Sequence, residues 1–378
     1  MIDDFEEFDA WIKKQTDAYT LHTLALRSAL RLVPILISRL AETDTDTSSQ
    51  SLFALAYFIR SITKIEQVGA SYIHSKEHLS PLLVKCQGDI GTALGMTCEA
   101  VIYSNFDQIP ALVRSGKDYL VYPMYNLRIR AHSALSKEIS AAPNLKKQIP
   151  KVLDEWDGTL FTDASLSNTR DLSFEEPLYH DTLFAKSFRG IFPRLEEHFW
   201  RDWYQGFLDG NPLDWELQRR VALIPDEDWE KGPEHIAHLI EEIRARFELE
   251  KRIEDLEAEK QVWQERARLG IGGNNPPEAI EDARIVQEII WAPIEELKAE
   301  TQSEAPDKSR IKSAISKLGA ALIAIGKWPL GKLDKAADEF AKSLGKWGGG
   351  ACAGWLALNS DKIAEIIKAA QTWLGTLF

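Results

Sequence analysis

The sequence predicts an all-α fold: a multi-helical bundle with a long charged helix and a C-terminal amphipathic helical region. Three observations support this prediction. Apolar residues recur at helical spacing through the first 145 residues, a charge-dense stretch without internal proline runs from Pro233 to Leu269, and apolar stripes return after Asp307. We therefore divide the chain into segments 1–145, 150–269, 270–306 and 307–378.

The first segment, 1–145, is predicted to be a helical bundle. Between Thr20 and Leu40 leucine, valine and isoleucine dominate, and Arg27, Arg31 and Arg39 interrupt them at helical spacing. After the polar break TDTDTSSQ a second helical stretch contains Phe53, Leu55, Phe58, Ile62 and Ile65. Connections of ordinary length between such helices favour a bundle.

Segment 150–269 is predicted to be a tryptophan-rich helical module. Two prolines in Ala141–Pro150 mark its start, and the weakly periodic stretch from Thr159 to His180 is expected to be a loop. Ten of the twelve tryptophans lie at or after Trp200, so the composition changes here. The residue chemistry of Asp209–Pro212 predicts a turn.

A long charged helix is predicted from Pro233 to Leu269. Proline is well suited to a first helical position, and glycine follows the predicted end. We expect this helix to act as a coiled-coil arm, for self-association or for a protein partner. Its predicted apolar seam consists of Ile236, Leu239, Ile243, Phe247, Ile253, Leu256 and Trp263.

The last two segments differ in charge. A Gly/Pro linker, GIGGNNPPE, and an acidic helix make up 270–306. From Asp307 onward there are eleven lysines and arginines and six acids, a net charge of +5. The rest of the chain therefore carries −18, and the two parts sum to the net charge of −13. The segment 307–378 is therefore a basic region following an acidic body.

Charge and cysteine content exclude several classes of protein. A net charge of −13 argues against general nucleic-acid binding, which needs clustered basic residues. Cys86, Cys98 and Cys352 form neither a zinc-ribbon pair nor a disulfide framework. The acidic start MIDDFEEFDAWIKK does not resemble a secretory signal. We expect a cytoplasmic protein, peripheral at the inner membrane if its C-terminal region binds lipid.

No catalytic, cofactor-binding or metal-binding residue is predicted. The sequence HSKEH, from His74 to His78, matches a short zinc-protease pattern but lacks an identifiable third ligand. His235 and His238 with Glu234 and Glu241 can share a helix face, yet surface histidines among acids are the commoner arrangement. We therefore expect a protein that is not an enzyme.

The tryptophans of the middle segment allow two interpretations. Indole faces attract cations, so Trp200, Trp203, Trp215 and Trp229 can form a ligand cage. Large aromatic side chains more often build the core of a small helical module. We favour the core.

The C-terminal stripes carry the sharpest functional hypothesis. Basic amphipathic helices with boundary tryptophans bind anionic membrane surfaces, and glycines spaced as in WGGGACAGW permit close helix packing. The alternative is that the same stripes pack against one another in a helical domain. The predicted membrane or packing contacts are Trp347, Gly350, Gly354, Trp355, Lys362, Ile363, Ile367, Lys368, Trp373 and Leu374.

The region from Phe192 to Glu278 resembles a module of uncharacterised helical proteins from alphaproteobacteria. The resemblance rests on a W-Y pair at Trp203, a G-x-P-L turn at Gly210, I-P-D-E-x-W from Ile224, G-P at Gly232 and the following GIGGNNPP. It implies a bacterial, intracellular, helical protein and suggests a defence or mobile-element setting. It implies no activity.

These observations lead to two functional hypotheses. The first is a non-enzymatic protein whose acidic body senses a partner and whose C-terminal region acts at the membrane. The second is a soluble helical scaffold or regulator that forms homo-oligomers through the long helix.

Overall fold

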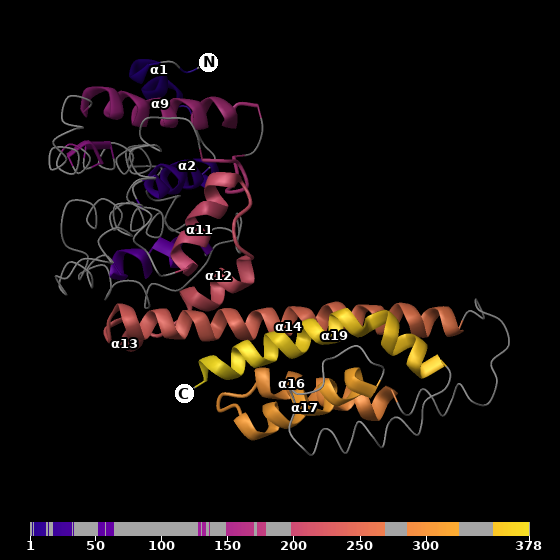
Figure 1. Cartoon of the computed structure of the whole chain (residues 1–378). Coiled ribbons are helices and arrows are strands. Elements are labelled where there is room, and N and C mark those ends of the chain that lie inside the picture. Colours follow the sequence, from indigo (N-terminus) through magenta and orange to yellow (C-terminus); the bar gives the residue numbers. More distant parts are fainter. Residues whose placement is uncertain are drawn as a thin grey trace, which may run out of the picture. The chain divides into compact units, whose positions relative to one another are not determined.

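The computed structural model describes residues 2, 4–12, 14, 18–31, 33, 52–56, 58–63, 128–129, 131–133, 136, 149–169, 172–178, 198–268, 286–324 and 351–377. Within these residues the secondary structure consists of helices, turns and short irregular segments, and no strand occurs among them. The predicted all-α fold is confirmed. The chain forms two compact units, Met1–Ala237 (unit 1) and His238–Phe378 (unit 2) (Figure 1).

In unit 1, helix α9 (Ile149–Ser167) packs against α1 (Phe5–Ile12) and α2 (Ala18–Leu30). The Phe8 and Phe161 rings are 5.7 Å apart, and the backbone N–H of Ile2 donates to Ser165 Oγ at 2.8 Å. These contacts place the start of the chain on α9. Residues 52–56 and 58–63 are also helical and contribute buried apolar side chains, among them Phe58 and Ile62.

Helix α9 corrects one prediction, because Thr159–Ser167 is helical and not a loop. The helix carries the buried polar residues Asp157, Thr159 and Asp163. Polar groups in these positions break the apolar period by which amphipathic helices are recognised. Pro150 lies in the first turn of α9, where its missing N–H costs no helical hydrogen bond.

The tryptophan-rich part of unit 1 contains α11 (His198–Asp209), α12 (Trp215–Ala222) and the single turn α13 (Asp226–Trp229). Arg60 joins this part to the helical residues 58–63. Its guanidinium donates to the carbonyls of Ala222 and Ile224 and to Asp226 Oδ1. One side chain therefore satisfies carbonyl groups at the end of α12 and fixes the start of α13.

The long helix is α14 (Pro233–Arg268), which confirms the predicted helix to within one residue. Gly232 precedes it with a φ of 99°, a conformation that favours glycine, and Pro233 follows at the first helical position. The boundary between the two units falls inside α14, after Ala237.

In its described residues unit 2 contains the remainder of α14, a π-helical turn η5 (Gln287–Trp291) and helices α16 (Ala292–Thr301), α17 (Lys308–Ala324) and α19 (Ala351–Thr376). Helix α17 packs against both α16 and α19. All of these helices contribute to one apolar core, whose members include Leu249, Ile253, Leu256, Ile294, Leu297, Ile311, Leu318, Leu322, Ile363, Ile366 and Trp373.

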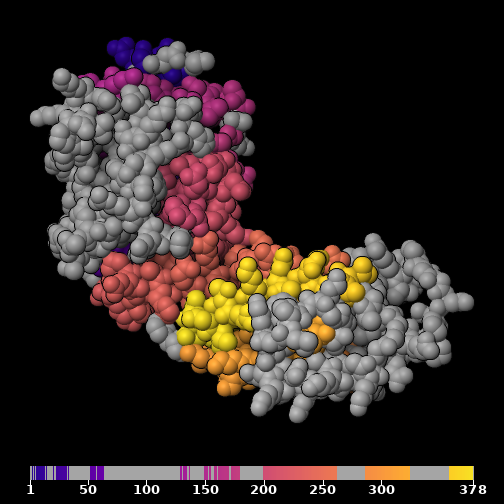
Figure 2. All heavy atoms as spheres, viewed as in Figure 1, coloured from indigo at the N-terminus to yellow at the C-terminus, as the bar shows by residue number. Residues whose placement is uncertain are grey.

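Ion pairs surround this core. Lys298 contacts Glu257 at 2.7 Å, Lys317 contacts Glu296 at 2.9 Å, and Lys362 contacts Glu259 at 2.8 Å. The side chains are about a third to half exposed, so each pair contributes little to the free energy of unfolding. Burial of apolar surface is therefore the main force that holds α19 in unit 2, while its outward side, yellow in Figure 2, faces solvent.

Candidate functional site

The candidate site in unit 1 is built on the aromatic face of α11. Trp200, Trp203 and Phe207 are separated by three and four residues, so they lie on one side of the helix, and each is at most 1% exposed. Neighbouring rings meet edge to face: the centroids of Trp200 and Trp203 are 5.5 Å apart, and those of Trp203 and Phe207 are 5.2 Å apart. This geometry is favourable for aromatic pairs and leaves the rings little freedom.

A buried glutamine connects this face to α12. The Trp203 indole N–H donates to Gln218 Oε1 at 2.8 Å, and Gln218 Nε2 donates to the Leu213 carbonyl at 2.6 Å. Gln218 is itself fully buried, so these bonds satisfy polar atoms that have lost water. The segment that leads into α12 is thereby fixed against α11.

The turn between α11 and α12 ends α11 as the sequence predicts. Gly210 has a φ of 68°, its N–H donates to the Phe207 carbonyl, and the Asn211 N–H donates to the Gly206 carbonyl. This pair of bonds is a Schellman cap, which requires a left-handed residue after the helix. Asp214 then caps α12 by accepting from the Glu216 N–H at 3.0 Å.

Replacing Gly210 with alanine should destabilise unit 1 by about 2 to 3 kcal/mol. A Cβ at this position would lie 2.5 Å from the Glu175 carbonyl oxygen and 2.8 Å from Pro177 Cδ, in addition to the left-handed φ. The matched control is Gly158→Ala in α9, where a Cβ meets nothing within 4 Å. That change should stabilise unit 1 by about 0.5 to 1 kcal/mol. Native-state hydrogen exchange of both variants measures the two effects, and equal effects would contradict the strained turn.

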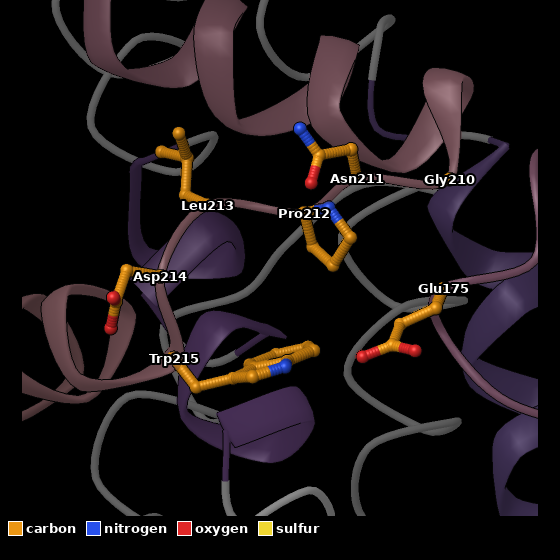
Figure 3. Close-up of a pocket in the computed structure, with 7 residues that line it drawn as sticks. All are labelled: Glu175, Gly210, Asn211, Pro212, Leu213, Asp214 and Trp215. Carbon is orange, nitrogen blue, oxygen red and sulfur yellow. The ribbon is translucent and has the colours of Figure 1, made fainter.

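A pocket of about 480 Å³ opens to solvent beside this turn. The Trp215 indole forms one wall, and the rings of Phe174 and Phe207 pack against it at 6.0 and 6.2 Å. The Glu175 carboxylate points towards the indole from the opposite side, and Pro212 lies above the space between them in the view of Figure 3. The lining residues are Glu175, Gly210, Asn211, Pro212, Leu213, Asp214 and Trp215.

The charges around this pocket are acidic. Glu175 and Asp214 both line it, and among the residues that the structure describes no basic side chain does. Glu216, one residue beyond the lining, binds Arg219 at 2.6 Å and Arg220 at 3.0 Å. The hydrogen bond from Arg219 lowers the pKa of Glu216 to about 2, against a smaller opposing effect of burial. Those two arginines are thus paired within α12, and the pocket keeps its negative character.

A buried arginine holds the segment that carries Glu175. Arg27 in α2 forms a bidentate pair with Asp163 in α9 at 3.1 and 3.2 Å. Its remaining donors bind the carbonyls of Ser173, Glu176 and Pro177 at 2.6 to 3.3 Å. Arg31 adds a second contact to Asp163 at 2.9 Å. The backbone on both sides of Glu175 is therefore fixed from the interior.

A second charged cluster in unit 1 joins Arg128 and His132 to Asp157 of α9. The contacts measure 2.6 Å from Arg128 Nη2 and 3.0 Å from His132 Nε2. Burial of Asp157 opposes its ionisation, but the hydrogen bonds from His132 and Arg128 outweigh burial and lower the pKa of this carboxyl. The cluster connects the helical residues around Arg128 to α9, and none of its three side chains lines the pocket beside Trp215.

The four tryptophans that the sequence assigns to a core or a ligand cage differ in their burial. Trp200, Trp203 and Trp229 are buried, and the Trp229 indole donates to the Ile224 carbonyl at 3.1 Å. For these three the core interpretation is confirmed. Trp215 alone of the four is partly exposed and lines the pocket. Sequence spacing does not distinguish it from the others, since its exposure depends on the segment around Glu175.

The predicted C-terminal contact residues lie in unit 2. Ile363, Ile367 and Trp373 are at most 1% exposed and belong to its core, and Leu374 packs against that core. Lys362 binds Glu259, and Lys368 is exposed. Gly354 and Trp355 belong to α19, but their side-chain surroundings are outside the described part of the structure, as are Trp347 and Gly350 altogether.

Among the described residues, the histidines of the long helix do not form a metal-binding site. His235 Nε2 lies 2.9 Å from Asp228 Oδ1 in a surface pair. Among the residues whose positions are described, no three histidine, cysteine, aspartate or glutamate side chains gather as a metal site would require. His74–His78 lies outside these residues.

Among the described residues no helix combines the length and the apolar content needed to cross a bilayer.

The comparisons with known proteins give no match. No family model matches the chain, and neither a curated protein nor a solved structure is significantly similar to it.

Proposed function

We propose that this chain is a non-enzymatic helical scaffold or regulator, in which unit 1 senses a partner and unit 2 is a folded helical module. One observation carries the proposal: the apolar stripe of α19 is buried in the core of unit 2. Ile363, Ile366, Ala370 and Trp373 are 0% exposed. A stripe used for packing is not available to lipid at the same time.

The free energy needed to expose the apolar stripe of α19 also supports the scaffold proposal. Burial of a large apolar side chain contributes about 1.5 to 3 kcal/mol. The four large buried side chains of α19 therefore contribute on the order of 10 kcal/mol; they are Ile363, Ile366, Ile367 and Trp373. A membrane or ligand that releases α19 has to supply a comparable difference in binding free energy. Release without such a ligand is therefore rare.

The long helix is used within unit 2. Ile253 and Leu256 of the predicted apolar seam belong to the core, and so does Leu249. The exposed residues include Glu254 and Asp255, so two copies packed through this side would bring like charges together. We therefore assign the outward side of Pro233–Leu269 to a protein partner with a basic surface, and self-association through it is the alternative.

Co-flotation with liposomes tests the proposal. The full-length protein should remain unbound with both neutral and anionic vesicles, because α19 is packed in unit 2. Point substitutions are better probes than removal of 307–378, since that deletion takes α17 and α19 out of the core and exposes Leu249 and Leu297. Flotation of the unmodified chain with anionic vesicles would contradict the scaffold proposal.

Membrane action after release of α19 is the second candidate function. It is supported by the +5 balance of 307–378 and by Lys368 on the exposed side of α19. Leu318→Ala weakens the core that α17 shares with α19 and leaves the sequence of α19 unchanged. If release exposes a lipid-binding helix, this variant floats with anionic vesicles and adding Lys368→Glu reduces the effect. If Leu318→Ala floats no more than the unmodified chain, loosening this core does not promote lipid binding, which argues against the second function.

A cytoplasmic location, peripheral at the inner membrane in the second case, is part of the proposal. So is a bacterial defence or mobile-element setting, which rests on the resemblance of the region Phe192–Glu278 alone.

A further inference from the structure

We propose that the pocket between Glu175 and Trp215 binds an organic cation, namely a protonated amine, guanidinium or quaternary ammonium group. The inference deepens the proposed function, because it assigns a chemistry to the partner that unit 1 senses. It rests on the combination of a cavity, a partly exposed indole and two carboxylates among the described lining residues.

The indole supplies the first half of the recognition. A cation is attracted to the face of tryptophan more strongly than to any other aromatic ring. Trp215 is partly exposed to the cavity, whereas Phe174 and Phe207 pack against it at centroid distances of 6.0 and 6.2 Å. The ring is thus supported by buried aromatic residues and presents its remaining surface to a ligand.

The carboxylates supply the second half. The Glu175 side chain points at the indole across the pocket, so a cation held between them lies next to both a negative charge and the aromatic ring (Figure 3). Asp214 adds negative charge at the rim, although its carboxylate is also engaged as the cap of α12. That cap offsets the positive end of the α12 dipole, which would otherwise oppose a cation.

The site is preorganised. Arg27 binds the carbonyls of Ser173, Glu176 and Pro177, and Gln218 binds the carbonyl of Leu213. The backbone on each side of the pocket is therefore fixed before a ligand arrives, which reduces the entropy lost on binding. The volume of about 480 Å³ accommodates one side chain or a small free amine.

The test is a titration of the full-length ¹⁵N-labelled protein, followed by the chemical shift of the Trp215 indole N–H. That signal is identified as the one lost in Trp215→Phe. The probes are N-acetyl-arginine-methylamide, N-acetyl-lysine-methylamide and choline, with N-acetyl-norleucine-methylamide as the neutral control. We expect the cations to bind with a Kd on the order of 1 to 10 mM and the neutral compound not to bind.

The variants identify the groups responsible. Glu175→Gln should raise the Kd by about 2- to 5-fold, since it removes one partly exposed ion pair. Asp214→Asn, which retains a capping side chain, should have a smaller effect. Glu234→Gln removes an exposed acid that does not line the pocket and should leave the Kd unchanged.

The probes also distinguish the source of the cation. Tighter binding of the capped amino acids than of choline indicates a side chain of a peptide partner, and the reverse indicates a free quaternary amine. Equal shifts with the neutral compound, or a Kd that is the same in Glu175→Gln and wild type, would overturn the inference. The result is independent of vesicle flotation, so failure here leaves the scaffold proposal to its own test.

Discussion

Asp163→Ala is expected to destabilise unit 1 by about 3 to 5 kcal/mol, the loss that follows when one partner of a buried ion pair is removed. Asp163 is 0% exposed, and its carboxylate contacts Arg27 and Arg31, which are 1% and 3% exposed. The substitution removes this carboxylate from two buried guanidinium groups. The same change should loosen the segment Ser173–Pro177, because Arg27 binds its carbonyls.

Hydrogen exchange followed by mass spectrometry measures the loss of stability separately for each segment of the chain. A measurement by segment is needed because a protein of two units is not expected to unfold as one two-state system. Exchange should accelerate in α2, α9 and residues 172–178. The matched control is Asp154→Ala, which removes an exposed aspartate from the same helix and should change stability by less than about 0.5 kcal/mol. Equal exchange in the two variants would show that the carboxylate of Asp163 is dispensable.

Trp373→Ala is expected to destabilise unit 2 by about 3 to 5 kcal/mol, in the range measured for loss of a large buried aromatic side chain. Trp373 is 0% exposed in the core of unit 2, and its indole N–H donates to Glu242 Oε1 at 2.7 Å. The alanine leaves a cavity between α19 and its neighbours and removes the donor from Glu242. Both losses act on the attachment of α19.

Exchange of amides in α16, α17 and α19 should increase in this variant, while α2 and α9 keep the exchange of the wild type, because Trp373 belongs to the core of unit 2. Gln371→Ala is the control, since Gln371 is exposed on the same helix. A Trp373→Ala variant that exchanges like Gln371→Ala would mean that α19 is not held by its apolar stripe, and the main support for the scaffold proposal would be lost.

Apolar periodicity predicts the elements of unit 2 because they bury ordinary aliphatic side chains at helical spacing. Ile311, Leu318 and Leu322 in α17 and Ile363, Ile366 and Ile367 in α19 are all in the core, as a packed helical domain requires. The same residues satisfy the pattern of a membrane-binding helix. Periodicity identifies the buried face of a helix but does not identify what covers it.

The structure of unit 1 is less predictable from sequence because charged residues occupy interior positions. Arg27 and Asp163 are separated by 136 residues, and neither shows in the sequence which partner it meets. The buried polar residues Thr159 and Asp163 interrupt the apolar period where the loop was wrongly predicted. Gly210, by contrast, was identifiable as a turn residue, because its role depends only on its immediate neighbours. Prediction of the pocket requires both the local turn at Gly210 and the long-range contacts of Arg27. The sequence therefore did not predict it.

The attachment of Ser173–Pro177 to Arg27 also bears on how this pocket can change during evolution. Arg27 binds carbonyl oxygens, which every residue type possesses, so the path of the segment does not depend on the side chain at Glu175. A substitution at position 175 can alter the charge offered to a ligand while the fold is retained. Ligand preference and stability are thus encoded by different residues, and relatives of this protein can diverge in what they bind without losing unit 1.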